Sequence, residues 1–455
     1  ELLTSSGIQV EGYFGGYSPR NFDNVHVAVC TIEKANSIVN KLLEKNKINS
    51  IGCIVVDEVH LISDPSRGYI LELLLAKILY VNQKIDCNIQ IITMSATLPN
   101  LDLLTNWLRA EFYHTNYRPV ELKEMIKINN QIFDNKLQLL RTISDQDFKQ
   151  FPKDPDNIGQ MCVETILENG SVIVFCPSKD WCETLSNHLA GYIFHIGASK
   201  TDMGLKLRAQ INLPLIEETK AQLRNCPTGL DSVLERTLSY GCAYHHAGLT
   251  SDERDIVESA FKTGSIRIII ATSTLSSGVN LPARRVIIRS PLFGGKTMNA
   301  LTYKQMIGRA GRTGKDSIGE SILICDNRNK KSGEELFVAT LKPLSSCLAM
   351  DSCVNLKRAI LEVIASGMAT TKADLEAFCD CTLLSTEKHI NFKCEILDNE
   401  FKCSSGNGSQ EQDHGSDPIG TCMRFLFKYE FIRFQMNENT KEMNFIATRL
   451  GNACL

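Results

Sequence analysis

Short apolar segments alternate with helix-like segments along residues 25–119 of the sequence. Strands that alternate with helices predict a parallel sheet with helices on both of its faces. The expected strands are 25–30, 53–56 and 89–94, and the expected helices are 32–45, 69–79 and 101–108. The predicted fold class is therefore α/β.

The same alternation returns after a polar segment. Residues 144–157 contain several aspartates and prolines, which is typical of a linker between domains. A second parallel-sheet domain is predicted by further strand-like runs, at 171–176, 266–271, 285–289 and 321–324. Residues 199–230 are polar and irregular, so we expect an insertion there.

After Lys342 the pattern changes to helices followed by two short strands. Helix, helix and hairpin is the order of an α+β winged-helix module, and the expected hairpin strands are 431–435 and 444–447. A run of serine, glycine, glutamine and aspartate predicts a disordered loop at 404–418. The expected divisions are 1–118, a linker and extension at 119–165, a second domain at 166–342 and the winged helix at 343–455.

Composition argues against several classes of protein. The chain has 49 lysines and arginines against 52 acids, so nucleic acid would have to be held locally. The 17 cysteines occur without paired CxxC units, which favours reduced thiols and argues against zinc. The sequence contains no signal peptide and no apolar run of about 18 residues, which argues against secretion and membrane insertion.

Two adjacent acids follow the apolar segment 53–56. Because open α/β sheets bind ligands at the carboxyl ends of their strands, Asp57 and Glu58 are candidates for phosphoryl-transfer chemistry. Asp57 could hold Mg²⁺ on nucleotide phosphates, and Glu58 could orient or deprotonate the attacking water. His60 could sense the phosphate. The alternative is an acidic strand end without a catalytic role.

Ser95 and Thr97 follow the next strand and place two hydroxyls near the same edge of the sheet. These hydroxyls could exchange hydrogen bonds with His60. The alternative is an ordinary strand-to-helix turn in which Asn100 or Asp102 caps the helix.

The sequence Gln-Met-Ile-Gly-Arg-Ala-Gly-Arg at 305–312 is the counterpart in the second domain. Arg309 and Arg312 are three residues apart, so we expect them on one helical face, and the neighbouring glycines permit close backbone approach. This arrangement suits arginines that reach a γ-phosphate. The alternative is a solvated basic helix.

A hydroxyl-rich segment follows one strand of the second domain. Hydroxyls and backbone amides bind the phosphates of a nucleic-acid strand without reading its bases, which makes Thr272, Thr274 and Ser178 candidates for that contact. Gly278 and Asn280 are candidates for contacts with the nucleotide. Plain loops are the alternative at all these positions.

Two further motifs favour structural roles. His245 and His246 are adjacent but have no third ligand nearby, which argues against a metal site. Gly-Gly-Lys-Thr at 294–297 ends like a phosphate-binding loop, but Ser290 stands where that pattern needs a glycine.

The motifs DEVH, SATLPN, VFCPSK, YHHAGL, TSTLSSGVNLPARR and QMIGRAGRTG occur in this order along the chain. Together they resemble the superkiller-like branch of superfamily 2 helicases. Within that branch, residues 29–36, 67–75 and 293–295 are most similar to the helicase region of the DNA polymerase theta family. The polymerase-theta-like helicases that lack a polymerase are the second choice.

The resemblance implies two RecA-like domains that clamp ATP and Mg²⁺, followed by a winged helix. It implies 3′ to 5′ movement on single-stranded or forked DNA, a role in double-strand break repair and a nuclear location. By matching motifs it implies that Asp57 and Glu58 serve magnesium and water, and that Arg309 and Arg312 are arginine fingers. The remaining implied roles are those of Gln305, which couples to His60, and of Thr31, Thr272 and Thr274, which touch the DNA backbone.

Two alternatives stay open. An RNA helicase of the same branch fits equally well, because phosphate contacts do not separate RNA from DNA. A non-hydrolysing nucleic-acid clamp would not need the acids and the arginines.

The winged helix is only mildly basic around Arg424, Lys428 and Arg433, so we expect a scaffold and no sequence-specific binding. The residues do not indicate an oligomeric state.

The family's first motif, with its catalytic lysine and threonine, is missing from the sequence, which opens at Glu1. We therefore expect a fragment whose phosphate-binding loop lies upstream, and we predict that the 455-residue chain alone does not hydrolyse ATP. Phosphate release with and without DNA, compared with that of a chain extended at both ends, measures this. DNA-stimulated hydrolysis by the 455-residue chain that Glu58→Gln abolishes would contradict the prediction.

Overall fold

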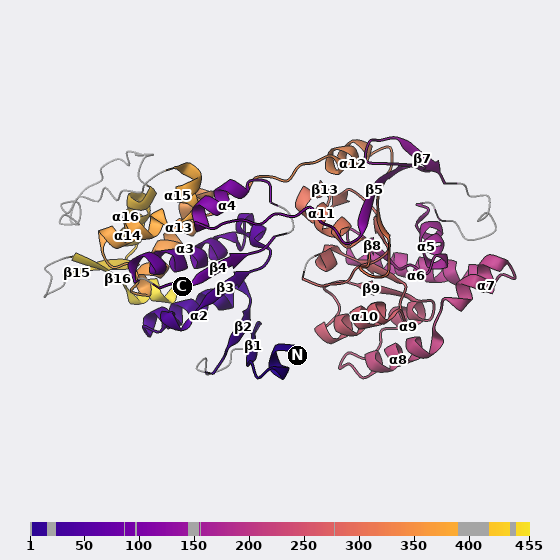
Figure 1. Cartoon of the computed structure of the whole chain (residues 1–455), viewed down its shortest axis with the longest axis horizontal. Helices are drawn as coiled ribbons and strands as arrows, with labels where there is room; N and C mark the ends of the chain where they lie inside the picture. The colour runs from indigo at the N-terminus through magenta and orange to yellow at the C-terminus, as the bar shows by residue number, and fades with distance from the viewer. Residues whose placement is uncertain are drawn as a thin grey trace. The chain divides into compact units, whose positions relative to one another are not determined.

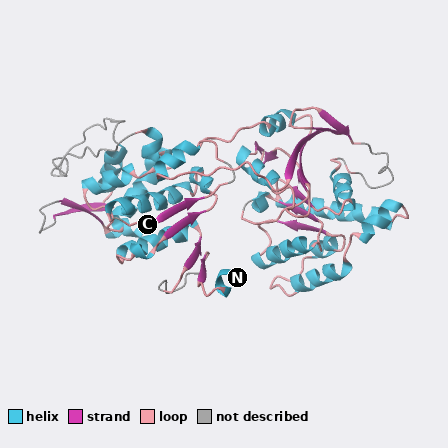
Figure 2. Ribbon diagram, in the orientation of Figure 1, coloured by secondary structure: helices cyan, strands magenta, loops and turns pink. Residues whose placement is uncertain are grey.

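The computed structural model describes residues 2–15, 24–85, 87–95, 98–143, 154, 156–276, 278–389, 418–436 and 443–455. The chain divides into two compact units (Figures 1 and 2). Unit 1 comprises Glu1–His114 with Lys342–Leu455, and unit 2 comprises Thr115–Leu341. Among the described helices, none has both the length and the apolar content that a membrane span requires.

Unit 2 is built on an eight-stranded sheet with the order β7-β6-β5-β14-β11-β8-β10-β9. The six strands from β5 to β9 in that order pair in parallel, and β6 and β7 are antiparallel additions at one edge. The strands are β5 (Glu121–Ile128), β6 (Gln131–Phe133), β7 (Leu139–Thr142), β8 (Val172–Phe175), β9 (Cys242–His245), β10 (Ile268–Ala271), β11 (Arg285–Ile288) and β14 (Ile318–Cys325).

The four neighbouring strands β11, β8, β10 and β9 are buried along their whole length. Valine and isoleucine dominate three of them, which suits a parallel sheet covered on both faces. Their register pairs Ile288 with Phe175, Phe175 with Ala271, and Ala271 with His245, so all four strands end at one level. The residues that follow them therefore form a row along one edge of the sheet.

Most helices of unit 2 begin at a side-chain cap. Thr250 and Glu253 form a capping box at the start of α10, and Asn299 caps α11 through the backbone N–H of Thr302. The helices are α5 (Ile158–Leu167), α6 (Lys179–Ala198), α7 (Asp202–Ala209), α8 (Leu213–Arg224), α9 (Ser232–Leu238), α10 (Ser251–Thr263), the 3₁₀ helix η4 (Ser273–Ser276), α11 (Ala300–Gly308) and α12 (Lys330–Phe337).

Two expectations for this unit differ from the structure. The segment 119–165 was expected as a linker and extension, but it contributes β5, β6, β7 and α5, and β5 pairs with β14 from Glu121 to Ile128. The segment 199–230, whose sequence looked irregular, forms α7 and α8, and its interpretation as an insertion stays a prediction. These helices bury few apolar residues, so their periodicity is weak in the sequence and their caps are the better signal.

Unit 1 contains two pairs of short parallel strands and two groups of helices. β1 (Val10–Tyr13) pairs with β2 (Val27–Cys30), and β3 (Cys53–Val56) pairs with β4 (Gln90–Thr93). The helices of the first segment are α1 (Leu2–Ser5), α2 (Ile32–Glu44), α3 (Gly68–Lys84) and α4 (Leu101–Leu108), with the 3₁₀ helices η1 (Ile48–Ser50) and η2 (Val59–Ser63).

The second segment of unit 1 has the expected winged-helix order. An antiparallel hairpin follows the helices, and the turn expected at 437–440 lies outside the described residues. The loop expected at 404–418 also lies outside them, except for Pro418, which begins α16. The elements are α13 (Met350–Ala365), α14 (Lys372–Asp380), α15 (Leu383–Lys388), α16 (Pro418–Lys428), β15 (Ile432–Met436), β16 (Met443–Ala447) and α17 (Arg449–Ala453).

A buried polar cluster joins the two segments of unit 1. The Lys77 ammonium on α3 donates to Asn36, Asn40 and the Glu362 carboxylate on α13, over 2.9, 2.6 and 2.5 Å. Both asparagine amides donate to the same carboxylate oxygen of Glu362. Removing one partner of such a buried pair typically costs about 3–5 kcal/mol, so this contact fixes how the segments pack.

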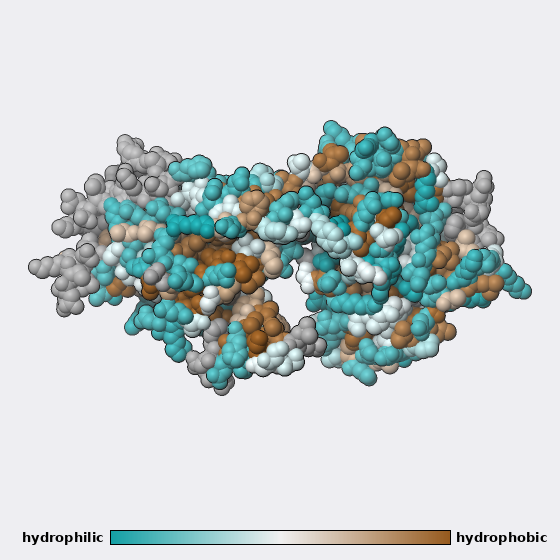
Figure 3. Space-filling model, viewed as in Figure 1, coloured by the Kyte–Doolittle hydropathy of each residue, from teal (hydrophilic) through white to brown (hydrophobic). Residues whose placement is uncertain are grey.

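The strands of unit 1 leave apolar side chains exposed. Residues alternate between half-buried and exposed along β2, β3 and β4. Figure 3 shows apolar patches on unit 1 in the region of these strands. The exposed apolar residues on or next to them are Val27, Val29, Val55, Ile92 and Met94.

A second buried acid in unit 1 predicts that the stability of the fold depends on pH. Glu72 is fully buried and accepts hydrogen bonds from Ser346 Oγ and Leu384 N. Burial raises the pKa of Glu72 from 4.5 to about 7. The folded state therefore holds this proton more tightly than the unfolded chain does. The contribution of the protonated Glu72 to the free energy of unfolding is full below pH 4.5 and is lost as the pH rises through about 7.

We predict that Glu72→Gln removes this dependence, because a neutral amide does not ionise. Between pH 5 and pH 8, the free energy of unfolding of unit 1 should fall by about 2–3 kcal/mol more in the wild type than in the variant. Denaturant titrations at both pH values measure this, with the exposed Glu44→Gln as the control. Parallel pH curves for wild type and Glu72→Gln would refute the assignment.

Candidate functional site

The acids of unit 1 lie directly after β3. Asp57 is exposed, and its Oδ1 accepts the backbone N–H of Glu58 at 2.9 Å. Glu58 has φ 54° and ψ 46°, a left-handed conformation that costs a residue other than glycine about 1–2 kcal/mol. Strain of this kind persists where the surrounding structure enforces it, and it occurs often at functional sites.

Glu58 also presents an unsatisfied carboxylate atom. Its Oε2 is buried and has no hydrogen-bond partner among the described residues. The His60 ring lies 3.2 Å from it, without hydrogen-bond geometry. A buried acceptor without a partner is costly, so this oxygen fits a proton donor such as a water molecule. The hard oxygens of Asp57 and Glu58 also suit Mg²⁺.

His60 and Ser95 connect β3 to β4. The strand register brings Val56 opposite Thr93, and His60 Nδ1 lies 2.9 Å from Ser95 Oγ in a hydrogen bond. His60 is buried, and burial lowers its pKa although the charges of Glu58 and Asp57 oppose this. The ring is therefore neutral at pH 7. Thr97, the other expected hydroxyl, lies outside the described residues.

In unit 2, Arg309 holds the loop that contains Gly278 and Asn280. Its guanidinium donates to the carbonyl of Ser276 from Nη2 over 2.8 Å and to the carbonyl of Val279 from Nη1. Gly278 has φ 77°, a left-handed conformation open to glycine. The structure thus brings together three of the residues expected to contact the nucleotide.

Arg312 does not share a helical face with Arg309, and that expectation is wrong. Helix α11 ends at Gly308, and Gly311 has φ 96° and lies so close to Val120 that a side chain would clash with it. The chain therefore turns between the two arginines, as only glycine readily allows.

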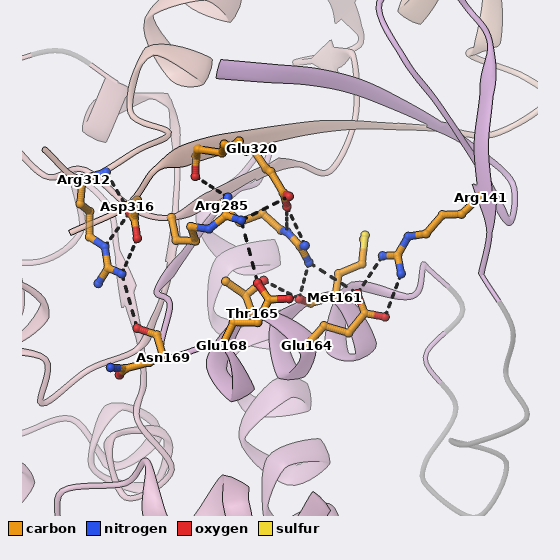
Figure 4. Close-up of polar contacts among 12 residues, drawn as sticks. Arg141, Met161, Glu164, Thr165, Glu168, Asn169, Arg285, Arg312, Asp316 and Glu320 are labelled. Carbon is orange, nitrogen blue, oxygen red and sulfur yellow. Dashed lines mark hydrogen bonds and ion pairs between the residues drawn. The ribbon is translucent and has the colours of Figure 1, made fainter. Parts of the chain in front are cut away.

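The guanidinium of Arg312 pairs with Asp316 over 2.8 Å from both Nε and Nη2, and Nη2 also donates to Asn169 O (Figure 4). Burial alone would raise the pKa of Asp316, but the hydrogen bonds and charge of Arg312 lower it, so the carboxylate is ionised. Asn169 precedes β8, which places this pair at the amino-terminal edge of the sheet. Asp316 was not predicted from the sequence, because it meets Arg312 across a turn and not along a helix.

The candidates for nucleic-acid contact have local structural roles. Ser178 caps α6 by accepting the backbone N–H of Trp181, and Thr31 caps α2 in the same way through Lys34. The hydroxyls of Thr272 and Thr274 lie 3.0 Å apart after β10. Ser178 and Thr272 follow adjacent strands at the level carboxyl edge of the unit 2 sheet.

The two remaining motifs have partners within unit 2. His245 and His246 contact Glu258 and Glu183 over 3.0 and 3.1 Å, and no metal-binding group of three ligands occurs within the described part of the chain. Residues 294–297 belong to a hairpin of β12 (Leu292–Phe293) and β13 (Lys296–Thr297). Gly294 and Gly295 have φ 59° and 77°, as a two-residue hairpin turn requires, so this is no phosphate loop.

Comparison with known proteins gives matches along most of the chain. Residues 1–104 match the DEAD/DEAH box helicase family, 215–314 the helicase conserved C-terminal domain, and 319–433 a helix-turn-helix domain. DNA polymerase theta of Drosophila melanogaster is 55% identical over 458 residues, which cover 100% of this chain and 22% of that protein. The chain is homologous to a superfamily 2 helicase region.

Two further relatives support this conclusion. The helicase POLQ-like protein of Homo sapiens is 39% identical over 411 residues, covering 87% of this chain and 36% of that protein. ATP-dependent DNA helicase Hel308 of Thermoplasma acidophilum is 30% identical over 418 residues, covering 90% of this chain and 56% of that protein. The chain spans about a fifth of the polymerase theta relative and about half of the Hel308 relative.

These matches confirm the resemblance and the expected fold class of the helicase region. The DEAD/DEAH match falls on the acids of unit 1, and the C-terminal helicase match includes Arg309 and Arg312. Gln305 lies on α11 of unit 2, whereas His60 belongs to unit 1. Their coupling, and the expectation that acids and arginines act on one nucleotide, stay predictions.

The contacts of Arg309 predict that it stabilises the loop it holds. We expect Arg309→Lys to raise amide hydrogen exchange at residues 278–283 about ten-fold, because an ammonium cannot serve both carbonyls as the guanidinium does. Exchange measured by mass spectrometry tests this, with the highly exposed Arg328→Lys as the control. Unchanged exchange in Arg309→Lys would show that the loop does not depend on this side chain.

Proposed function

We propose that this chain is the motor region of an ATP-dependent DNA helicase that moves 3′ to 5′ on single-stranded or forked DNA. Its work would be in double-strand break repair in the nucleus. The observation that carries the proposal is the strained Glu58, whose buried Oε2 lacks a hydrogen bond among the described residues, next to Asp57 and to the His60–Ser95 hydrogen bond. The names of the relatives, which include DNA polymerase theta and an ATP-dependent DNA helicase, supply the substrate class.

In the proposed mechanism, Asp57 and Glu58 divide the work at the end of β3. Asp57 is the exposed carboxylate that would hold Mg²⁺, which when bound neutralises charge on the nucleotide phosphates. Glu58 orients the attacking water and accepts its proton at the buried oxygen. His60 is neutral at pH 7, so it can exchange hydrogen bonds with Ser95 without a change of charge.

In this proposal, Arg309 and Arg312 stabilise the negative charge that develops on the γ-phosphate in the transition state. Each would exchange a present partner for the phosphate: the carbonyls of Ser276 and Val279 for Arg309, and Asp316 for Arg312. Gly278 and Asn280 contribute backbone and amide contacts to the nucleotide. Gln305 links this set to His60.

The DNA strand is proposed to run along Thr31, Ser178, Thr272 and Thr274, which offer hydroxyls and backbone amides to its phosphates. The winged helix acts as a scaffold, because Lys77 and Glu362 tie it to the first segment of unit 1. A non-hydrolysing clamp is disfavoured, since it would gain nothing from the conformational cost at Glu58.

Glu58→Gln should lower the DNA-stimulated kcat of the chain extended at both ends by about 10²–10⁴-fold, because the amide cannot accept the proton of the water. The exposed Glu111→Gln is the matched control and should behave as wild type. ATP hydrolysis and unwinding are measured together on DNA and RNA duplexes with 3′ single-stranded tails.

Three outcomes would overturn parts of the proposal. Hydrolysis at the wild-type rate by Glu58→Gln would remove the catalytic assignment. Unwinding of the RNA duplex alone would move the chain to the RNA helicases. DNA binding without hydrolysis by the extended wild type would favour the clamp.

A further inference from the structure

Trp181 is an exposed aromatic side chain in the first turn of α6. The residue is 49% exposed, whereas the other tryptophan, Trp107, is 3% exposed and donates its indole N–H to Cys381 O. A single exposed aromatic residue is common on protein surfaces and indicates nothing by itself. The contacts of Trp181 and its place in the fold distinguish it from that background.

The ring of Trp181 is held in place by charged neighbours. The guanidinium carbon of Arg289 lies 4.0 Å from the ring centroid, a cation–π contact. Arg289 in turn donates from Nε and Nη2 to Asp156 Oδ2 over 3.1 and 2.9 Å. Asp156 therefore holds Arg289 in place, and Arg289 holds the Trp181 ring. Because the indole is already oriented, binding a ligand on it costs little side-chain entropy.

The ring also lies at the carboxyl edge of the sheet, where ligands of open α/β sheets bind. Arg289 follows β11 and Trp181 follows β8, and these adjacent strands end level with β10, which Thr272 and Thr274 follow. With strands about 4.8 Å apart, the level ends of β11, β8, β10 and β9 span about 14 Å, enough for a short stretch of extended strand. A base-sized flat surface and a pair of hydroxyls therefore share one row.

The charges along this row favour stacking over phosphate attraction. Asp156 is paired with Arg289, and Glu183 contacts His246. Asp180 and Lys179 are both exposed in the first turn of α6 and offset one another. A row with so little net positive charge gains little from counterion release, so an aromatic face contributes a larger share of the affinity.

We propose that Trp181 is a stacking platform for an unpaired base of single-stranded DNA, with Arg289 and Asp156 as its positioning residues. The hydroxyls of Thr272 and Thr274 contact the backbone of the same strand. This inference rests on the proposed DNA-binding function and adds a contact to bases that is independent of their sequence, since every base has a π-face.

The test measures binding of the 455-residue chain to a labelled 20-nucleotide oligo-dT and to an abasic strand of the same length. Trp181→Ala should weaken binding to oligo-dT by about 5- to 100-fold, and Trp181→Phe by less than about three-fold, because phenylalanine keeps an aromatic face. Wild type and Trp181→Ala should bind the abasic strand equally. Phe194→Ala is the matched control, since Phe194 lies on the same helix and is 47% exposed.

A second measurement uses the tryptophan fluorescence. Oligo-dT should quench the wild type, and the quenching should disappear in Trp181→Phe, which leaves only the buried Trp107. If Trp181→Ala binds oligo-dT like wild type, or if the quenching persists in Trp181→Phe, the platform is refuted while the proposed function stands. If the wild type binds neither strand, DNA binding by this chain fails and the platform fails with it.

Discussion

The parallel register of β11, β8, β10 and β9 is the constraint on which the arrangement of unit 2 depends. Each strand is buried along its length, so exposed polar residues appear only beyond its ends. Because the strands stop at one level, the residues after them form a single edge that carries Ser178, Thr272 and Arg289. The opposite edge carries the pair of Arg312 and Asp316. Apolar pairing along the strands thus determines which polar groups become neighbours.

Unit 1 combines buried polar groups with local strain. The cluster of Lys77, Asn36, Asn40 and Glu362 satisfies each charge with hydrogen bonds, which is what makes burial of the pair tolerable. Glu58, in contrast, adopts a costly backbone conformation and leaves one oxygen without a hydrogen bond. Selection for stability alone would remove that cost, so its presence beside Asp57 is better explained by chemistry than by packing.

The sequence predicted those features that depend on local periodicity. The strand Cys53–Val56 and the helix Leu101–Leu108 appear with the expected bounds, because a short continuous apolar run fits a strand and apolar residues three to four apart fit a helix. The sequence failed where the outcome depends on distant partners. It did not predict that residues 121–128 pair with β14, that Gly311 turns the chain between Arg309 and Arg312, or that Asp316 engages Arg312. Nor could it show that Arg289 supports the Trp181 ring, since 108 residues of sequence separate them.

The outward faces of β2, β3 and β4 have a practical consequence. Valine, isoleucine and methionine side chains there are open to solvent, and a formal net charge of -3 provides little electrostatic repulsion between molecules. Concentrated solutions of this chain should therefore aggregate readily, and more so in sulfate or phosphate buffers, which strengthen apolar association. Dilute handling, or acidic substitutions on those faces, should keep it monodisperse.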